Sequence, residues 1–267
     1  MAKRSGLSDN FYLAGIDMSG DVGAVTAIKM PRTLLDCTGI NKSAHERFNG
    51  LKDGEISFNS FWNDGATAYG AAPANRAGAA GTSMFQLSSL PTADIIVSYF
   101  MGTALGGWTA NMVAKQVNYD NTRGADGSLI SATQCMANGF GLEWGQSLTA
   151  GIRTDTAATT PGTGVDNTEA IVSTAFGMSA YLQVFSFTGT SVTMQIQDSA
   201  DNAAFANITG LAAFTVVNGV TSQRIETDTL ARTIRRYLRV ITTGTFNPCS
   251  FAVMACIYAA ANREGPR

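Results

Sequence analysis

The chain has 267 residues, enough for one large or two modest domains, and its 18 basic and 20 acidic residues give a net charge of −2. Only 14% of the residues are charged, below the roughly 25% usual for soluble domains. A surface of this kind is readily buried against copies of itself, which favours assembly. The near-neutral balance disfavours a nucleic-acid reader, which normally concentrates basic residues in a stripe.

The sequence predicts a protein that neither spans a membrane nor leaves the compartment where it is made. No run of about 18 apolar residues free of charge occurs, and the N-terminal MAKRSGLSDNFYLAG lacks the apolar core of a secretory signal. The four cysteines have no CxxC spacing, and we interpret them as reduced core residues. They are Cys37, Cys135, Cys249 and Cys256.

Residues 33–62 are predicted to form a strand, a short helix and a second strand. Ser43 and Glu46 make a capping box, and Gly50 stands where a helix commonly ends, so we expect a helix near 43–50. The following strand should be half-buried, because Ile56 and Phe58 alternate with polar residues.

Residues 64–82 are small and glycine-rich and predict a long loop. After it, residues 128–157 predict two strands joined around Asn138 and Gly139, a pair suited to a turn with positive φ. Residues 159–170 are rich in Thr, Gly and Pro and are predicted to link two modules. Further strands are predicted at 94–101, 181–187, 192–197, 213–217, 237–241 and 251–258.

We therefore expect a mainly β fold, with turns at about ten-residue spacing as in β-sandwiches. The predicted organisation is a β domain at 1–158 that contains the helix and the long loop, a linker at 159–170, and a second β-sandwich-like module at 171–267.

The sequence offers little catalytic chemistry. Its single histidine, His45, lies in the predicted helix and is interpreted as solvent-facing, and no GxSxG, HExxH, GxxxxGK[ST] or GxGxxG motif occurs. Asp198 and Asp201 are a weak calcium candidate without the full loop pattern, and a turn between strands is the favoured interpretation. We expect no enzyme activity, no catalytic residue, no metal and no cofactor.

Two other groups of side chains have binding potential. Four arginines could form a phosphate-facing patch, although ion pairs with Glu226, Asp228 or a neighbouring subunit are favoured. Three tryptophans could form a sugar-binding platform, although packing in a core or an interface is favoured. These residues are Arg232, Arg235, Arg236, Arg239, Trp62, Trp108 and Trp144.

The segment LLDCTGINKSAHERFNGLKDGEISFNSF resembles the tail tube proteins of long-tailed bacteriophages, and NGFGLEWGQSLTAG is similar to a late strand region of that family. The resemblance covers about residues 10–155, and 171–267 fit it less well. The matching positions are Asp36, Thr38, Glu46, Gly50, Leu51, Asp53, Gly54, Ile56, Phe58, Asn138, Gly139, Glu143 and Trp144.

This resemblance implies a β-sandwich or half-barrel with a flanking helix. Copies would form a hexameric ring, or a trimer that imitates one, and rings would stack into a hollow tube that DNA crosses during infection. The partners would be further copies and other tail proteins, the site of assembly the host cytoplasm, and the final location the virion tail. Alternative functions are a capsid decoration protein, another β-sandwich tail protein, or a carbohydrate-binding module.

Overall fold

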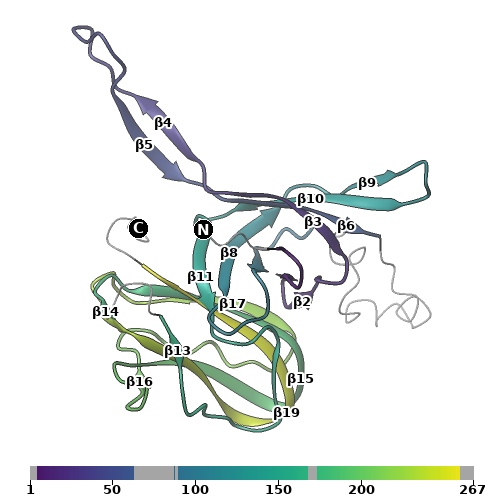
Figure 1. The fold of residues 1–267 in the computed structure, drawn as a ribbon, viewed down its shortest axis with the longest axis vertical. Coiled ribbons are helices and arrows are strands. Elements are labelled where there is room, and N and C mark those ends of the chain that lie inside the picture. Colours follow the sequence, from purple (N-terminus) through teal and green to yellow (C-terminus); the bar gives the residue numbers. More distant parts are fainter. Residues whose placement is uncertain (1–4, 63–86, 88–89, 168–172, 259–267) are drawn as a thin grey trace.

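The computed structural model describes residues 5–62, 87, 90–167 and 173–258, and every element bounded within them is a β-strand. The predicted mainly β fold class is confirmed. A projecting two-stranded arm and two long curved strands dominate the outline (Figure 1). Among the described residues, no helix has the length and apolar character needed to cross a membrane. The predicted loop at 64–82 lies outside the described residues.

The first half of the chain supplies β1 (Asn10–Leu13), β2 (Ile16–Asp17), β3 (Val22–Lys29), β4 (Arg32–Asp36), β5 (Arg47–Lys52), β6 (Glu55–Phe61), β7 (Ile95–Phe100), β8 (Trp108–Gln116), β9 (Asp120–Arg123), β10 (Leu129–Ala137), β11 (Glu143–Ser147) and β12 (Arg153–Asp155). The second half supplies β13 (Val165–Asp166), β14 (Ser173–Thr174), β15 (Met178–Ser199), β16 (Ala206–Asn207), β17 (Thr221–Glu226), β18 (Ile234–Arg235) and β19 (Tyr237–Ile257).

Most strands join one large antiparallel sheet in the order β16-β15-β19-β11-β8-β10-β6-β3. β7 joins β1 to β8, and β17 pairs with the free side of β15. β11 connects the two halves of the chain, because it pairs with β8 on one side and with β19 on the other. The sheet therefore continues from the first half into the second.

β15 and β19 form a long ribbon that pairs from Met178 and Ile257 at one end to Ser199 and Tyr237 at the other. The register shifts near Gly189, whose φ is 144°. A Cβ at this position would lie 2.5 Å from the Cα of the facing residue in β19, so glycine permits the two backbones to approach.

The two faces of this ribbon enter different cores. Leu182 and its even-numbered neighbours on β15 face a core enclosed by the second half of the chain. Tyr181 faces the other side, where Tyr12 of β1 and Phe100 of β7 pack against it. Because both faces are covered, residues 178–185 are all buried and lack the alternation of a half-exposed strand.

The strands predicted from alternation are confirmed. In β6 the side chains of Ile56 and Phe58 are fully buried in a third core beneath β1, β7 and β8. Val192, Met194 and Ile196 in β15 are buried in the same alternating manner. β7 lies within the predicted strand at 94–101, and β19 contains the predicted strand at 237–241 and all but the last residue of the one at 251–258.

The predicted helix at 43–50 is wrong. Residues 47–52 form β5, which pairs antiparallel with β4, and the backbone N–H of Lys42 turns back to the carbonyl oxygen of Gly39. A helix of two turns is marginal without tertiary packing. The hairpin replaces it because cross-strand bonds to β4 satisfy the backbone of this segment.

Residues 213–217 were also predicted as a strand, but only Val217 forms a bridge, to Val192. Phe214 and Val217 are apolar because both enter the core under the ribbon. The segment therefore has the composition of a strand without strand pairing of its own.

The predicted linker, 159–170, runs beside β19 for part of its length. Thr159 and Thr242 exchange backbone hydrogen bonds, and β13 pairs with β19. The division into domains at 1–158 and 171–267 stays a prediction.

Candidate functional site

β4 and β5 form an arm, residues 32–52, that projects from the body of the molecule (Figure 1). Among the described strands, β4 pairs with β5 alone, so each leaves an open edge of backbone N–H and C=O groups. A two-stranded hairpin by itself is at best marginally stable in water. The arm therefore has the construction of an element completed by another surface.

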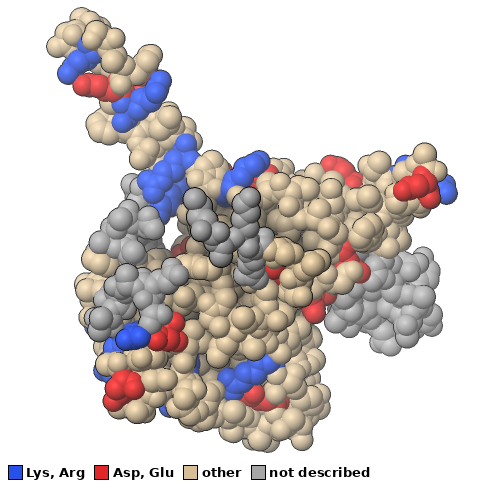
Figure 2. Space-filling model, viewed as in Figure 1, with Lys and Arg blue, Asp and Glu red and all other residues tan. Residues whose placement is uncertain are grey.

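The register of the arm places large apolar side chains on both of its faces. Leu35 lies opposite Phe48 on one face, whereas Leu34 lies opposite Asn49 on the other face. The exposed fractions are 58% for Leu34, 54% for Leu35, 67% for Phe48 and 76% for Leu51. In Figure 2 the arm shows uncharged surface between its charged groups. Contiguous exposed apolar surface of this kind marks an interaction site.

A hydrogen-bond network stabilises the tip of the arm. It includes three of the positions that carry the tail-tube resemblance, Asp36, Thr38 and Glu46. Asp36 accepts the backbone N–H of Thr38 at 2.9 Å and its hydroxyl at 2.5 Å, and His45 Nδ1 lies 2.9 Å from the other carboxylate oxygen. The Thr38 hydroxyl accepts the N–H of Glu46 at 2.9 Å. The hydrogen bonds that Asp36 accepts, first that of the Thr38 hydroxyl and then those of the Thr38 backbone and His45, lower the pKa of Asp36. The network shapes the tip of a hairpin, and His45 is solvent-facing but not helical.

Glycine and aspartate residues of the same pattern shape the strands and base of the arm. A Cβ at Gly50 would lie 2.9 Å from the carbonyl oxygen of Thr33, beside the register shift of β4. Asp53 accepts the N–H of Gly54 at 2.7 Å. A Cβ at Gly54 would lie 2.6 Å from the backbone nitrogen of Leu142. The Asp-Gly pair thus fixes where the arm leaves the body.

The second part of the pattern lies between β10 and β11. Gly139 has a φ of 77°, as the turn prediction requires, and the Asn138 side chain donates to Asp94 at 2.9 Å. Glu143 and Trp144 begin β11, and their side chains point to opposite faces of the sheet. Glu143 enters a buried polar cluster, whereas Trp144 is 37% exposed.

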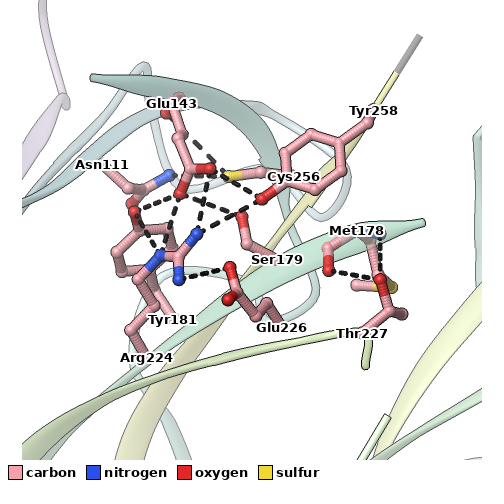
Figure 3. Close-up of polar contacts among 10 residues, drawn as sticks. All are labelled: Asn111, Glu143, Met178, Ser179, Tyr181, Arg224, Glu226, Thr227, Cys256 and Tyr258. Atoms are coloured by element: carbon pink, nitrogen blue, oxygen red, sulfur yellow. Dashed lines mark hydrogen bonds and ion pairs between the residues drawn. The ribbon is translucent and has the colours of Figure 1, made fainter. Parts of the chain in front are cut away.

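Figure 3 shows this cluster, which we call the Glu143 cluster: Glu143, Ser179, Tyr181, Arg224 and Tyr258. The Glu143 carboxylate accepts hydrogen bonds from Tyr258 at 2.8 Å, Ser179 at 3.0 Å, the Tyr181 hydroxyl, and Arg224 Nε and Nη2 at 3.1 and 3.2 Å. The side chains of Arg224 and Glu143 are only 7% and 15% exposed. The cluster fastens β11 to β15 and β17.

Arg224 has further partners that complete the cluster. It pairs with Glu226 at 2.8 Å, and its guanidinium lies 3.6 Å from the centre of the Phe140 ring. Burial by itself lowers the pKa of Arg224, but Glu143, Tyr181 and Tyr258 together outweigh this effect and leave the pKa above its ordinary value. Burial, followed by the Glu143 charge, raises the pKa of Tyr181 and of Tyr258. Arg224 therefore stays charged and both tyrosines stay protonated near neutral pH, as a structural ion pair requires.

The predicted arginines form local pairs. Arg232 pairs with Asp228 at 2.6 Å, as predicted, and Arg236 pairs with Asp166 at 2.7 Å. Glu226, the other predicted partner, pairs instead with Arg224. Arg235 Nε lies 3.8 Å from Asp198, and Arg239 donates to the side chain of Gln197. The sequence did not single out Arg224, because no local motif marks it.

Asp201 forms the turn that the sequence favours over a calcium site. Its carboxylate accepts the N–H groups of Ala203 and Ala204 at 2.9 and 2.8 Å and the hydroxyl of Ser199 at 2.7 Å. These bonds, that of Ala204 first, lower the pKa of Asp201 to about 2. Within the described residues, His, Cys, Asp and Glu side chains form no group of three that could hold a metal ion.

The cysteine prediction is right for three residues and wrong for Cys37. Cys135, Cys249 and Cys256 are buried free thiols, and burial raises the pKa of Cys135 to about 12. Cys37 is exposed because it follows β4 on the arm, where no core covers it.

Comparisons with protein-family models and with curated protein sequences find no match. Among solved structures, the chain is similar to the SPP1 Dit (gp 19.1) protein, described as a paradigm of the hub adsorption apparatus in Gram-positive infecting phages. The two share 11% identity with a TM-score of 0.36, over 93% of this chain and 99% of that one.

The chain is also similar to part of the virion of a native gene transfer agent particle, at 13% identity and a TM-score of 0.35, over 53% of this chain and 98% of that one. A third likeness is to a chain of the phage p2 baseplate in its activated conformation with Sr, at 9% identity and a TM-score of 0.34, over 94% and 98% of the two chains.

Proposed function

We propose that this chain is a structural protein of a bacteriophage tail that assembles with copies of itself, and that the arm joins one copy to the next. The observation that carries the proposal is the arm: a two-stranded sheet with open edges and exposed leucine and phenylalanine side chains on both faces. Burial of Leu35 and Phe48 would stabilise a contact by roughly 1.5 to 3 kcal/mol for each side chain.

A second copy is the partner that the arm fits best. An open β4 edge on one copy and an open β5 edge on the next offer complementary backbone donors and acceptors, and antiparallel pairing would continue the sheet. At the tip, Lys42 pairs with Glu46 and the Asp36 carboxylate lies 2.9 Å from His45 Nδ1, so these groups need no partner of opposite net charge. When a contact joins two different surfaces of neighbouring copies, repeating it produces a closed ring if the rotation from one copy to the next divides a full turn.

The finer form of the proposal rests on the sequence resemblance. A hexameric ring, or a trimer that imitates one, would stack with others into a hollow tail tube, with DNA as transient cargo and other tail proteins at its ends. A capsid decoration protein is the alternative, and it would form small oligomers that never stack.

The test replaces two arm residues that face the same side, Leu35→Asp with Phe48→Asp. A matched control puts the same two charges on exposed apolar residues outside the arm, Val216→Asp with Val220→Asp, which are 58% and 52% exposed. Sedimentation velocity and negative-stain electron microscopy over a concentration series would report association, and thermal unfolding would report folding.

We expect the parent and the control to form rings or tubes, and the arm variant to stay monomeric with an unchanged melting temperature. Normal assembly of the arm variant would show that the arm is not the contact. A parent that remains monomeric at every concentration would overturn self-assembly itself.

A further inference from the structure

Two exposed tryptophans lie side by side on one face of the main sheet. In the ladder between β8 and β11, Trp108 pairs with Gln146 and Ala110 pairs with Trp144, so all four side chains point to the same side. Trp108 is 44% exposed and Trp144 37%. Ala110 itself is fully buried in the core beneath β1, β7 and β8, so the exposed part of the group consists of the two indoles and Gln146. We call these four residues the tryptophan face.

The backbone beneath the tryptophan face is held rigidly. The N–H of Met101 donates to the carbonyl oxygen of Trp108 at 2.9 Å. The chain before β8 is tied to β11, because Gly106 donates to the carbonyl oxygen of Ser147 and Ser147 donates to that of Gly107, both at 2.9 Å. On the opposite side of β11, the Glu143 cluster anchors the strand. The indoles thus stand on a preorganised support, which limits the entropy lost when a ligand binds.

The side chains of this face carry no charge. Neither indole N–H, nor the Gln146 side-chain amide, makes a hydrogen bond with a described residue. The register neighbours on the same face, Tyr99 on β7 and Ala255 on β19, carry no charge. The Tyr99 hydroxyl donates to the Asp9 carboxylate. The face therefore combines flat apolar rings with neutral donors and an amide oxygen.

We infer that the tryptophan face binds a neutral saccharide chain, with one sugar ring against each indole. A sugar presents C–H groups to an aromatic face and hydroxyls that can both donate and accept, which matches two indole N–H groups and an amide. The apolar arm of a second copy fits less well. Leu35 and Phe48 have no polar side-chain atom, so these three groups would be buried without partners, and each would weaken the contact by roughly tenfold.

The test measures binding to the full chain by isothermal titration calorimetry and by tryptophan fluorescence. The probes are three neutral oligosaccharides: N-acetylchitohexaose, cellohexaose and maltohexaose. The variants are Trp108→Ala and Trp144→Ala. The matched control is Trp62→Ala. Trp62 follows β6, which pairs with the edge of β10 opposite β8 and β9, and its ring centre lies 6.5 Å from that of Tyr119. Circular dichroism would check that each variant is folded.

We expect saturable binding of at least one oligosaccharide, about tenfold weaker in each of the two face variants and unchanged in the control. If none of the three probes binds at millimolar concentration, or if both face variants bind like the parent, the proposal is overturned. A fluorescence change that follows protein concentration without sugar, and that persists after Leu35→Asp with Phe48→Asp removes the arm contact, would also overturn it and assign the face to a second copy. Because the arm is intact in these variants, the result is independent of the assembly proposal.

Discussion

The Glu143 cluster allows the sharpest stability test. Glu143→Gln keeps the size of the side chain but removes the charge opposite Arg224, whose own side chain is only 7% exposed. Removing one partner of a buried ion pair typically costs about 3 to 5 kcal/mol, because the remaining charge stays buried. The three hydroxyl donors and the two guanidinium N–H donors of the cluster would also lose one carboxylate oxygen as an acceptor. Against a total stability of about 5 to 15 kcal/mol, the loss would be a large fraction.

The free energy of unfolding would be measured by urea titration followed by circular dichroism. The double variant Glu143→Gln with Arg224→Met should recover much of the loss, because the buried cation is then gone and the partner it leaves, Glu226, is 28% exposed. Lys42→Met serves as the control, since it breaks an exposed ion pair with Glu46 and should cost no more than about 0.5 kcal/mol. If Glu143→Gln costs no more than Lys42→Met, the cluster does not hold the halves of the sheet together.

Three further predictions concern stability. Gly54→Ala would push a Cβ against the Leu142 backbone and should destabilise by about 1 to 3 kcal/mol in urea unfolding, whereas Gly20→Ala, with open space around it, should change little. Phe58→Ala should cost about 3 to 5 kcal/mol, and a loss below 1 would contradict its burial in the core. Asp201 has a lowered pKa, so its contribution is present above the ordinary value of 3.8 and lost as the pH falls toward about 2. The melting temperature of Asp201→Asn should therefore lie below that of the parent near neutral pH and converge with it in acid, and a constant difference would refute the assignment.

Local patterns in the sequence were sufficient to predict much of the fold. Alternation placed Ile56 and Phe58 on the buried face of a strand, because a strand exposes one side and buries the other. The pair Asn138-Gly139 marked a real turn, since the chemistry of a turn resides in two or three neighbouring residues.

The same local reasoning failed at residues 43–50. Ser43 and Glu46 have the spacing of a capping box, but capping contributes little when a segment of this length has no helix-packing surface. Pairing with β4 prevailed, and it turned the apolar residues of the supposed helix into the exposed side chains of the arm. Cys37 was misassigned for the same reason, because its exposure depends on the arm's projection.

By itself, the sequence determined that this is a mainly β chain of low charge, and where many of its strands and turns lie, because those properties depend on neighbouring residues. Only the tertiary structure brought Glu143 to Arg224 and Trp108 beside Trp144. Such contacts depend on which strands become neighbours, and that is decided by the packing of cores and the pairing of β11 with both β8 and β19.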